Sequence, residues 1–109
     1  MQIRKELKNM ENTGFGKRLK ELRQERDMTM EMLITDVNSK FGTNMNRSLV
    51  SRWESGASEP SLNYSRVICE YFNVSLDYMI GLTENRTPAR LLAYAKKFKE
   101  ITDDNKKKE

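Results

Sequence analysis

Apolar residues recur at intervals of three or four along almost the whole chain, and this spacing constrains the fold more than any other feature. Phe15, Leu19 and Leu22 follow it near the start, and Leu91 and Phe98 follow it near the end. Such spacing places apolar side chains on one face of an α-helix. The strict alternation that marks a half-buried strand is not sustained anywhere in the sequence. We therefore predict an all-α protein.

Capping residues divide this pattern into separate helices. A Ser, Thr or Asn directly before a helix accepts a hydrogen bond from a backbone N–H of the first turn, and a following Gly commonly ends the helix. We place caps at Thr13, Thr29, Asn46, Ser75 and Thr87, the last with a proline at the first helical position. The predicted helices span residues 2–11, 14–26, 30–41, 47–55, 62–72, 76–80 and 88–102.

The chain has 109 residues, enough for one domain with a modest core. We divide it into an N-terminal extension over residues 1–12, a main domain over residues 13–83, a C-terminal helix over residues 84–102 and a disordered tail over residues 103–109. No apolar run approaches the length of a membrane span, and the N-terminus lacks the apolar stretch of a secretory signal. We expect a soluble, cytoplasmic protein with no membrane partner.

The charge and the rare residue types narrow the function. A net charge of +4 favours an acidic partner such as nucleic acid, although an excess of this size is also common in proteins that bind no anion. Cys69 is the single cysteine, which excludes an internal disulfide, and we read it as a small buried hydrophobe. The absence of histidine, of a Gly-rich phosphate loop and of a Cys-x-x-Cys pair argues against an enzyme. We expect no catalytic residue, metal or cofactor.

The predicted helix over residues 47–55 has an unusual outer face. Val50 and Trp53 lie three residues apart and should face inward, where Trp53 belongs to the core. The residues left on the outer face are polar: Arg47, Ser48, Ser51, Arg52 and Ser55. Arg can contact a guanine edge through two hydrogen bonds, and Ser can bond to a base or a phosphate, so this face suits the DNA major groove. The alternatives are an ordinary solvated face and, for Arg52, a surface ion pair with Glu59 or another nearby acid.

The run from Phe15 to Leu82 resembles the five-helix DNA-binding domain of the lambdoid phage repressor and Cro-type family, the Xre family of helix-turn-helix regulators. The segments that carry the resemblance are GKRLKELRQERDMT, LVSRWESGASEPS and ICEYFNVSLDYMIGL. The pattern S-x-W-E-x-G-x-x-x-P is complete, with Ser51, Trp53, Glu54, Gly56 and Pro60. The resemblance implies that the helix over residues 47–55 is the recognition helix, and that a C-terminal amphipathic helix and a short N-terminal helical extension are additions to the domain.

Two features depart from the family pattern. Ile34 stands where these proteins usually have a small Ala, and the stretch from there to Ser51 is several residues longer than usual. The segment over residues 35–46 must therefore lengthen the second helix of the domain, the turn that follows it, or both. How far the recognition helix projects depends on that segment.

The resemblance implies roles for residues at matching positions. Contacts with DNA bases fall to Arg47, Ser48, Ser51 and Arg52, with at least one guanine expected in each half-site. Contacts with DNA phosphates fall to Arg23, Thr29, Met30, Gly56, Ala57, Ser58 and Ser61. Because the Met30 side chain offers no hydrogen bond, its contact falls to the backbone or to the Thr29 hydroxyl. The resemblance also implies an ion pair between Arg23 and Glu54 that joins the first helix to the recognition helix.

One helix-turn-helix unit makes too few contacts for tight operator binding, so we expect a homodimer on a palindromic double-stranded DNA operator. The segment over residues 88–102 is the better candidate for the dimer contact, and the segment over residues 2–11 is the other. The candidate residues in the C-terminal helix are Leu91, Tyr94, Phe98 and Ile101. The alternative is that this helix packs back on its own domain.

We conclude from the sequence that the protein is a sequence-specific transcription regulator, in particular a dimeric repressor of phage or mobile-element type. With no second domain to sense a ligand, induction falls to a protein partner such as an antirepressor. The alternative is an antitoxin or adaptor protein whose terminal helices bind another protein. Steep loss of DNA binding with rising salt favours the first function, and a stoichiometric complex with a protein favours the second.

Overall fold

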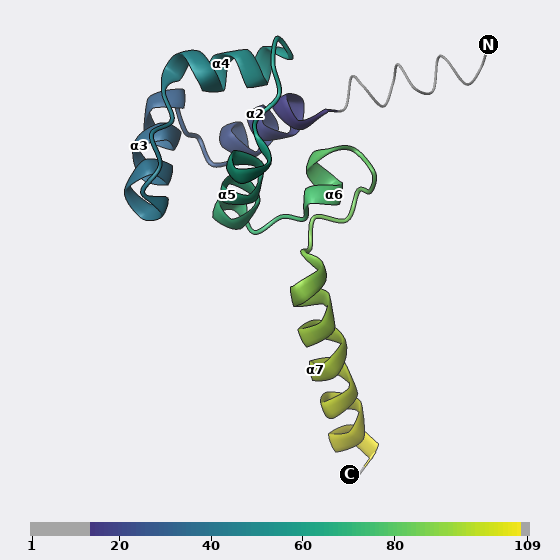
Figure 1. Ribbon diagram of the computed structural model, residues 1–109. Coiled ribbons are helices and arrows are strands. Elements are labelled where there is room, and N and C mark those ends of the chain that lie inside the picture. Colours follow the sequence, from purple (N-terminus) through teal and green to yellow (C-terminus); the bar gives the residue numbers. More distant parts are fainter. Residues whose placement is uncertain (1–13, 108–109) are drawn as a thin grey trace, which may run out of the picture.

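The computed structural model describes residues 14–107, which form six helices and no strand (Figure 1). They are α2 (Phe15–Glu25), α3 (Met30–Phe41), α4 (Arg47–Ser55), α5 (Leu62–Phe72), α6 (Leu76–Met79) and α7 (Ala89–Lys107). The predicted all-α class is confirmed. The helix predicted over residues 2–11 lies outside the described residues. None of the described helices is both long and apolar enough to cross a membrane.

Side-chain caps begin four of the helices. The hydroxyl or amide oxygens of these caps accept hydrogen bonds from backbone N–H groups three residues on: Thr29 from Met32, Asn46 from Leu49, Ser61 from Tyr64 and Ser75 from Tyr78. The first helix differs from the prediction, because Thr13 lies outside the described residues and the cap position of α2 is Gly14, which has no side chain to offer. At the other ends, Gly42 and Gly56 adopt left-handed backbone angles that end α3 and α4.

The core lies between α2, α3, α4 and α5, with α6 closing one end (Figure 1). Each of these helices contributes a fully buried side chain, namely Leu19, Leu33, Val50, Ile68 and Met79. Trp53 is 2% exposed, and its ring lies 5.5 Å from that of Tyr64. Cys69 is also buried, and burial raises the pKa of its thiol to about 11. Both residues therefore belong to the core, as predicted.

The backbones of α2 and α4 approach each other closely at Gly16. A Cβ at this position would lie 1.6 Å from the carbonyl oxygen of Trp53. Only glycine is compatible with this contact, which sets the start of α2 against the end of α4. The position of α4 is thus fixed by backbone packing as well as by side chains.

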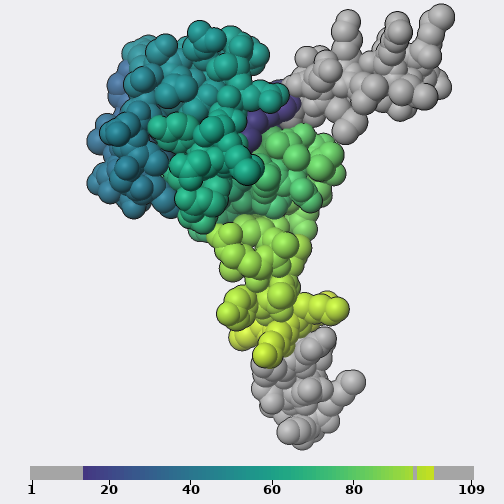
Figure 2. Space-filling model, viewed as in Figure 1, coloured from purple at the N-terminus to yellow at the C-terminus, as the bar shows by residue number. Residues whose placement is uncertain are grey.

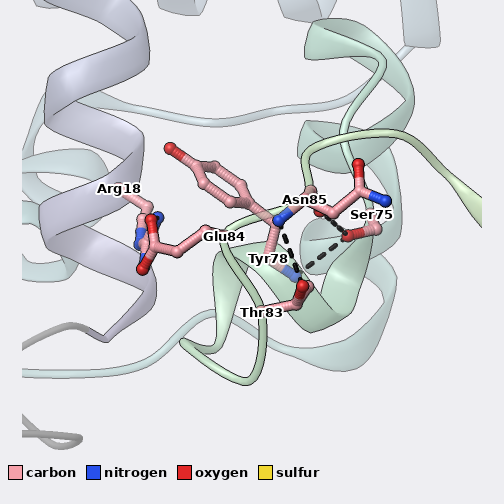
Figure 3. A network of polar contacts seen from close by, with 6 residues as sticks. All are labelled: Arg18, Ser75, Tyr78, Thr83, Glu84 and Asn85. Carbon is pink, nitrogen blue, oxygen red and sulfur yellow. Dashed lines mark hydrogen bonds and ion pairs between the residues drawn. The ribbon is translucent and has the colours of Figure 1, made fainter.

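The segment after α6 is anchored to the main domain (Figure 3). The Arg18 guanidinium donates hydrogen bonds of 3.3 and 3.0 Å to the Glu84 carboxylate and stacks 4.3 Å from the Tyr78 ring centroid. Arg86 likewise donates to Glu25 at 2.9 and 2.6 Å. These contacts hold Glu84 and Arg86 against α2, and α7 begins only at Ala89. The division of the chain at residue 83 stays a prediction.

Both ends of the C-terminal helix also differ from the prediction. Pro88 precedes the first helical residue instead of occupying it, and its carbonyl accepts the first hydrogen bonds of the helix, from the Leu91 and Leu92 N–H groups at 2.9 and 3.1 Å. At the far end α7 continues to Lys107, so residues 103–107 are helical, not the disordered tail expected. Extending an existing helix costs far less than nucleating one, and lysines at its C-terminus favour the helix dipole.

The described part of α7 stands clear of the rest of the molecule (Figures 1 and 2). Every side chain described between Ala89 and Lys99 is exposed. The alternative in which this helix packs back on its own domain is therefore not the arrangement found.

Candidate nucleic-acid interface

The outer face of α4 is polar and open to solvent, as the sequence predicts. Val50 and Trp53 are buried beneath the helix. The residues exposed on it are Arg47, Ser48, Ser51, Arg52 and Ser55. The helix runs along one edge of the domain, at the end of the molecule opposite to α7 (Figure 1). A helix held by its inner face and bare on its outer face has the shape that enters a major groove.

The entry to α4 is fixed by its cap and by the residue before the cap. Asn46 accepts a hydrogen bond of 2.8 Å from the Leu49 N–H. Met45 and Val50 are both buried, in the spacing of a hydrophobic staple around this cap. Two arginines and three serines are therefore presented on a helix whose start is held in place.

Asn38 holds the lengthened turn between α3 and α4, and the sequence analysis did not identify this role. Its side-chain amide donates to the Met45 carbonyl at 2.9 Å, and its carbonyl oxygen accepts from the Met45 N–H at 2.9 Å. The same oxygen accepts from the Thr43 hydroxyl at 2.7 Å. The connection between α3 and α4, residues 42–46, is thus held against the end of α3 by the side chain of Asn38. An Asn near the end of a helix that is followed by a long polar turn is the only signal the sequence offers.

Arg23 and Glu54 join α2 to α4, in the pair that the family resemblance implies. The Arg23 guanidinium donates two hydrogen bonds, of 2.9 and 2.8 Å, to the two carboxylate oxygens of Glu54, and a third of 2.8 Å to the Met28 carbonyl. The two side chains are only 11% and 3% exposed. Hydrogen bonding to this carboxylate raises the pKa of Arg23. Because the guanidinium is nearly buried and already donates three hydrogen bonds within the domain, it is poorly placed to bind a phosphate as well.

Arg47 and Arg52 differ in their surroundings. Arg47 forms an ion pair with Glu31 in the first turn of α3, and both side chains are more than half exposed. The sequence analysis did not anticipate this pair. Arg52 makes no ion pair with Glu59 or with any other residue in the described part of the chain. Its guanidinium is available to a ligand without prior release.

The ion pair between Arg47 and Glu31 is weak compared with a contact between an arginine and a guanine. An exposed pair of this kind stabilises a protein by about 0–1 kcal/mol. A two-hydrogen-bond contact between Arg and guanine discriminates between bases by about 1–3 kcal/mol. The pair with Glu31 is therefore too weak to fix Arg47 firmly in its present position.

The N-terminus of α3 retains part of its expected capacity to bind a phosphate. The Thr29 oxygen accepts a hydrogen bond of 3.1 Å from the Met32 N–H, which leaves its own O–H free to donate. Met30 is half-buried against the core, and its side chain offers no hydrogen bond. The negative charge of Glu31 in the same turn opposes a phosphate there.

The segment after α4 offers fewer donors than expected. The backbone N–H groups of Gly56, Ala57 and Ser58 bond within the chain, to Trp53, to the Ser55 hydroxyl and to Arg52. The donors that remain are the hydroxyl groups of Ser58 and Ser61, since the Ser61 oxygen accepts from the Tyr64 N–H but its O–H is unused. The backbone N–H groups of residues 56–58 are already bonded within the tight turn, and the phosphate contacts expected of Gly56, Ala57 and Ser58 stay a prediction.

Comparison with known proteins agrees with this arrangement. A helix-turn-helix family, HTH_3, matches residues 19–79, which include most of α2 and all of α3 to α6. No curated protein and no solved structure matched the chain. The family inferred from the sequence is confirmed, since the matched residues make up more than half of the chain. This protein belongs to the HTH_3 family of Xre and lambda-repressor-like helix-turn-helix regulators, and it is a DNA-binding regulator.

Proposed function

We propose that the protein is a sequence-specific transcription regulator, a dimeric repressor of phage or mobile-element type, that reads the major groove of a palindromic operator with α4. The observation that carries the proposal is the outer face of this helix. This face presents two arginines and small hydroxyl residues. The helix is held in place by the buried side chains of Val50 and Trp53, by the Asn46 cap and by the Glu54 carboxylate.

Arg52 is the principal base-reading residue in this proposal. Its guanidinium is exposed and makes no ion pair within the described residues, so it contacts a guanine edge without losing an existing partner. Arg47 reads a second position after leaving Glu31. Ser48 and Ser51 lie on the same exposed face and supply short hydrogen bonds to bases or phosphates.

Phosphate contacts come from the two sides of α4. On one side are the Thr29 hydroxyl and the first N–H groups of α3, and on the other the hydroxyls of Ser58 and Ser61. Arg23 acts indirectly, because its donors hold α4 through Glu54. The phosphate contacts set the register of the helix, and the arginines read the sequence.

The test is selection of bound sequences from a random DNA pool, with affinity for the enriched sequence measured at several salt concentrations. We expect a two-fold symmetric motif with a guanine in each half-site, and binding that weakens as salt rises because phosphate contacts release counterions. Enrichment of no motif, with only weak binding that fades with salt, would refute base reading.

A second candidate function is that of an antitoxin or adaptor, and one observation favours it. The side chains described on α7 from Ala89 to Lys99 are all exposed, so this helix is available to another protein. A stable stoichiometric complex with a protein, formed by a chain that selects no DNA motif, would support this function over the first.

A further inference from the structure

The connection between α3 and α4, residues 42–46, leads directly into the start of the recognition helix (Figure 1). It lies within the segment that is longer than is usual in the family. Between Asp36 and Glu54 the chain has no acidic residue and three cationic ones: Lys40, Arg47 and Arg52. The connection therefore belongs to a stretch of sequence that is suited to lie near a polyanion.

The residues of this connection divide into inner and outer positions. Thr43 and Met45 are turned toward α3, where the Thr43 hydroxyl and the Met45 backbone bond to the side chain of Asn38. Met45 is also only 4% exposed. Asn44 stands between these two residues and is exposed. Its side chain is thus presented to solvent directly before the recognition helix begins.

The backbone beside Asn44 is fixed before any ligand binds. Both the N–H and the carbonyl group of Met45 are hydrogen-bonded to Asn38, each at 2.9 Å. The Asn44 side chain itself makes no hydrogen bond within the described part of the chain. A side chain on a fixed backbone costs less conformational entropy to order at an interface. Asn44 therefore offers a carboxamide that has no partner to lose.

Asn44 is also close enough to Arg47 to reach neighbouring base pairs. The two residues are three apart, and a chain spans at most about 3.3–3.6 Å per residue, so their Cα atoms lie within roughly 11 Å of each other. Successive base pairs of B-DNA are about 3.4 Å apart. A recognition helix contacts base edges with its N-terminal residues. Asn44 consequently lies within about three base-pair steps of the base that Arg47 would read.

The chemistry of a carboxamide favours one partner among the groups exposed on DNA. Asn has both a donor and an acceptor in its side chain. Adenine presents the N6 amino group as a donor and N7 as an acceptor in the major groove, so Asn can form two hydrogen bonds with it. A phosphate offers acceptors alone and would leave the Asn carbonyl oxygen without a donor. Adenine is therefore the better match.

We propose that Asn44 is a further base-reading residue, specific for adenine within three base pairs of the base read by Arg47. Asn38 is then a positioning residue, which acts on the DNA only through Asn44. The proposal deepens the proposed function, on which it rests for the entry of α4 into the major groove. The connection before α4 thereby extends the sequence that one recognition helix reads.

The experiment selects bound sequences from a random DNA pool with the full chain, as the wild type and as Asn44→Ala. We expect Asn44→Ala to lose one adenine position of the motif and to bind the adenine-containing site about 5- to 150-fold more weakly. Sites with another base at that position should bind both proteins alike. Asn63→Ala is the matched control, because Asn63 is equally exposed but lies at the groove between α5 and the start of α7. Circular dichroism checks that each variant folds.

Asn38→Ala tests the positioning role. The measured quantity is the ratio of affinities for adenine and for other bases at the position that Asn44 reads. This ratio should fall in Asn38→Ala and should fall no further when Asn38→Ala is added to Asn44→Ala, because residues that act as a unit are not additive. A merely structural role of Asn38 would weaken binding to all bases equally. Asn44→Ala tests the base contact by itself if Asn38→Ala does not fold.

Two results for Asn44→Ala would overturn the proposal. The first is selection of the wild-type motif with the adenine position intact. The second is an equal loss of affinity for every base at that position, which would assign Asn44 to a phosphate. In both cases the wild-type chain still selects a motif, so only the present inference is lost. A wild-type chain that selects no motif would refute the proposed function, and this inference with it.

Discussion

The ion pair between Arg23 and Glu54 should be a principal determinant of both stability and the placement of α4. Glu54 is 3% exposed in its side chain and accepts two charge-assisted hydrogen bonds, of 2.9 and 2.8 Å. Removing one partner of a buried pair costs about 3–5 kcal/mol, because the other charge stays buried without compensation. We therefore expect Glu54→Ala to lower the free energy of unfolding by that amount. Glu54→Gln keeps one acceptor for Arg23 and should lose about 1–2 kcal/mol.

Urea unfolding measures these losses directly. The single Trp53 lies on α4 and is 2% exposed, so its fluorescence reports the environment of the helix in question. With a slope of about 1–3 kcal/mol per molar urea, a loss of 3 kcal/mol moves the midpoint by roughly 1–3 M. An unchanged slope would show that the change is one of stability alone.

The double variant Arg23→Met, Glu54→Leu is the sharper test of the reasoning. Each single change leaves a buried charge unpaired, whereas the double change removes both charges and fills the site with apolar atoms. The double variant should therefore be more stable than Glu54→Ala, with a coupling energy above about 1 kcal/mol. Additive losses, or a loss below about 1 kcal/mol for Glu54→Ala, would refute the account of this pair.

Three further perturbations test other parts of the account. In the same urea titration, Asn38→Ala should lower the free energy of unfolding by about 2 kcal/mol, because both backbone groups of Met45 lose their partner. Asn38→Asp keeps the acceptor for the Met45 N–H and should lower the free energy of unfolding by less. Glu31→Gln should tighten operator binding by roughly two- to fivefold in a fluorescence-anisotropy titration, by freeing Arg47 and removing a negative charge near DNA, and unchanged or weaker binding would contradict this. The pKa of Glu25 is lowered from its ordinary value of 4.5 by hydrogen bonds from an arginine, so its contribution to stability is full above that value and is lost as pH falls through the lower folded pKa. Unfolding of Glu25→Gln should accordingly depend less on pH below about 4.5 than that of the wild type, and identical pH profiles would count against the contact.

Local features of the fold could be predicted from the sequence because they depend on neighbouring residues. The caps Thr29 and Asn46 act within one helical turn, and the periodicity that buries Val50 and Trp53 is a property of one helix. The partner of Glu54 lies far away in the chain, and only the family resemblance indicated it.

Contacts between distant segments could not be predicted in the same way. Asn38 acquires its role only when the chain returns to place Met45 beside it. The ion pair of Glu31 with Arg47 depends on how α3 and α4 cross, which their separate patterns do not specify. The contact between Glu84 and Arg18 of α2 could not be predicted for the same reason, since periodicity contains no sign that Glu84 returns to α2.

The central claim is that α4 reads DNA bases through Arg52, and selection of bound sequences by Arg52 variants tests it most directly. Arg52→Ala should lose definition at one position of each half-site, while the rest of the motif is retained. Arg52→Lys is the matched control, because it keeps the charge but cannot make the planar two-hydrogen-bond contact, so it should retain more affinity and still lose the guanine. If Arg52→Ala selects the same motif as the wild type, this residue does not read a base and the account of the interface is wrong.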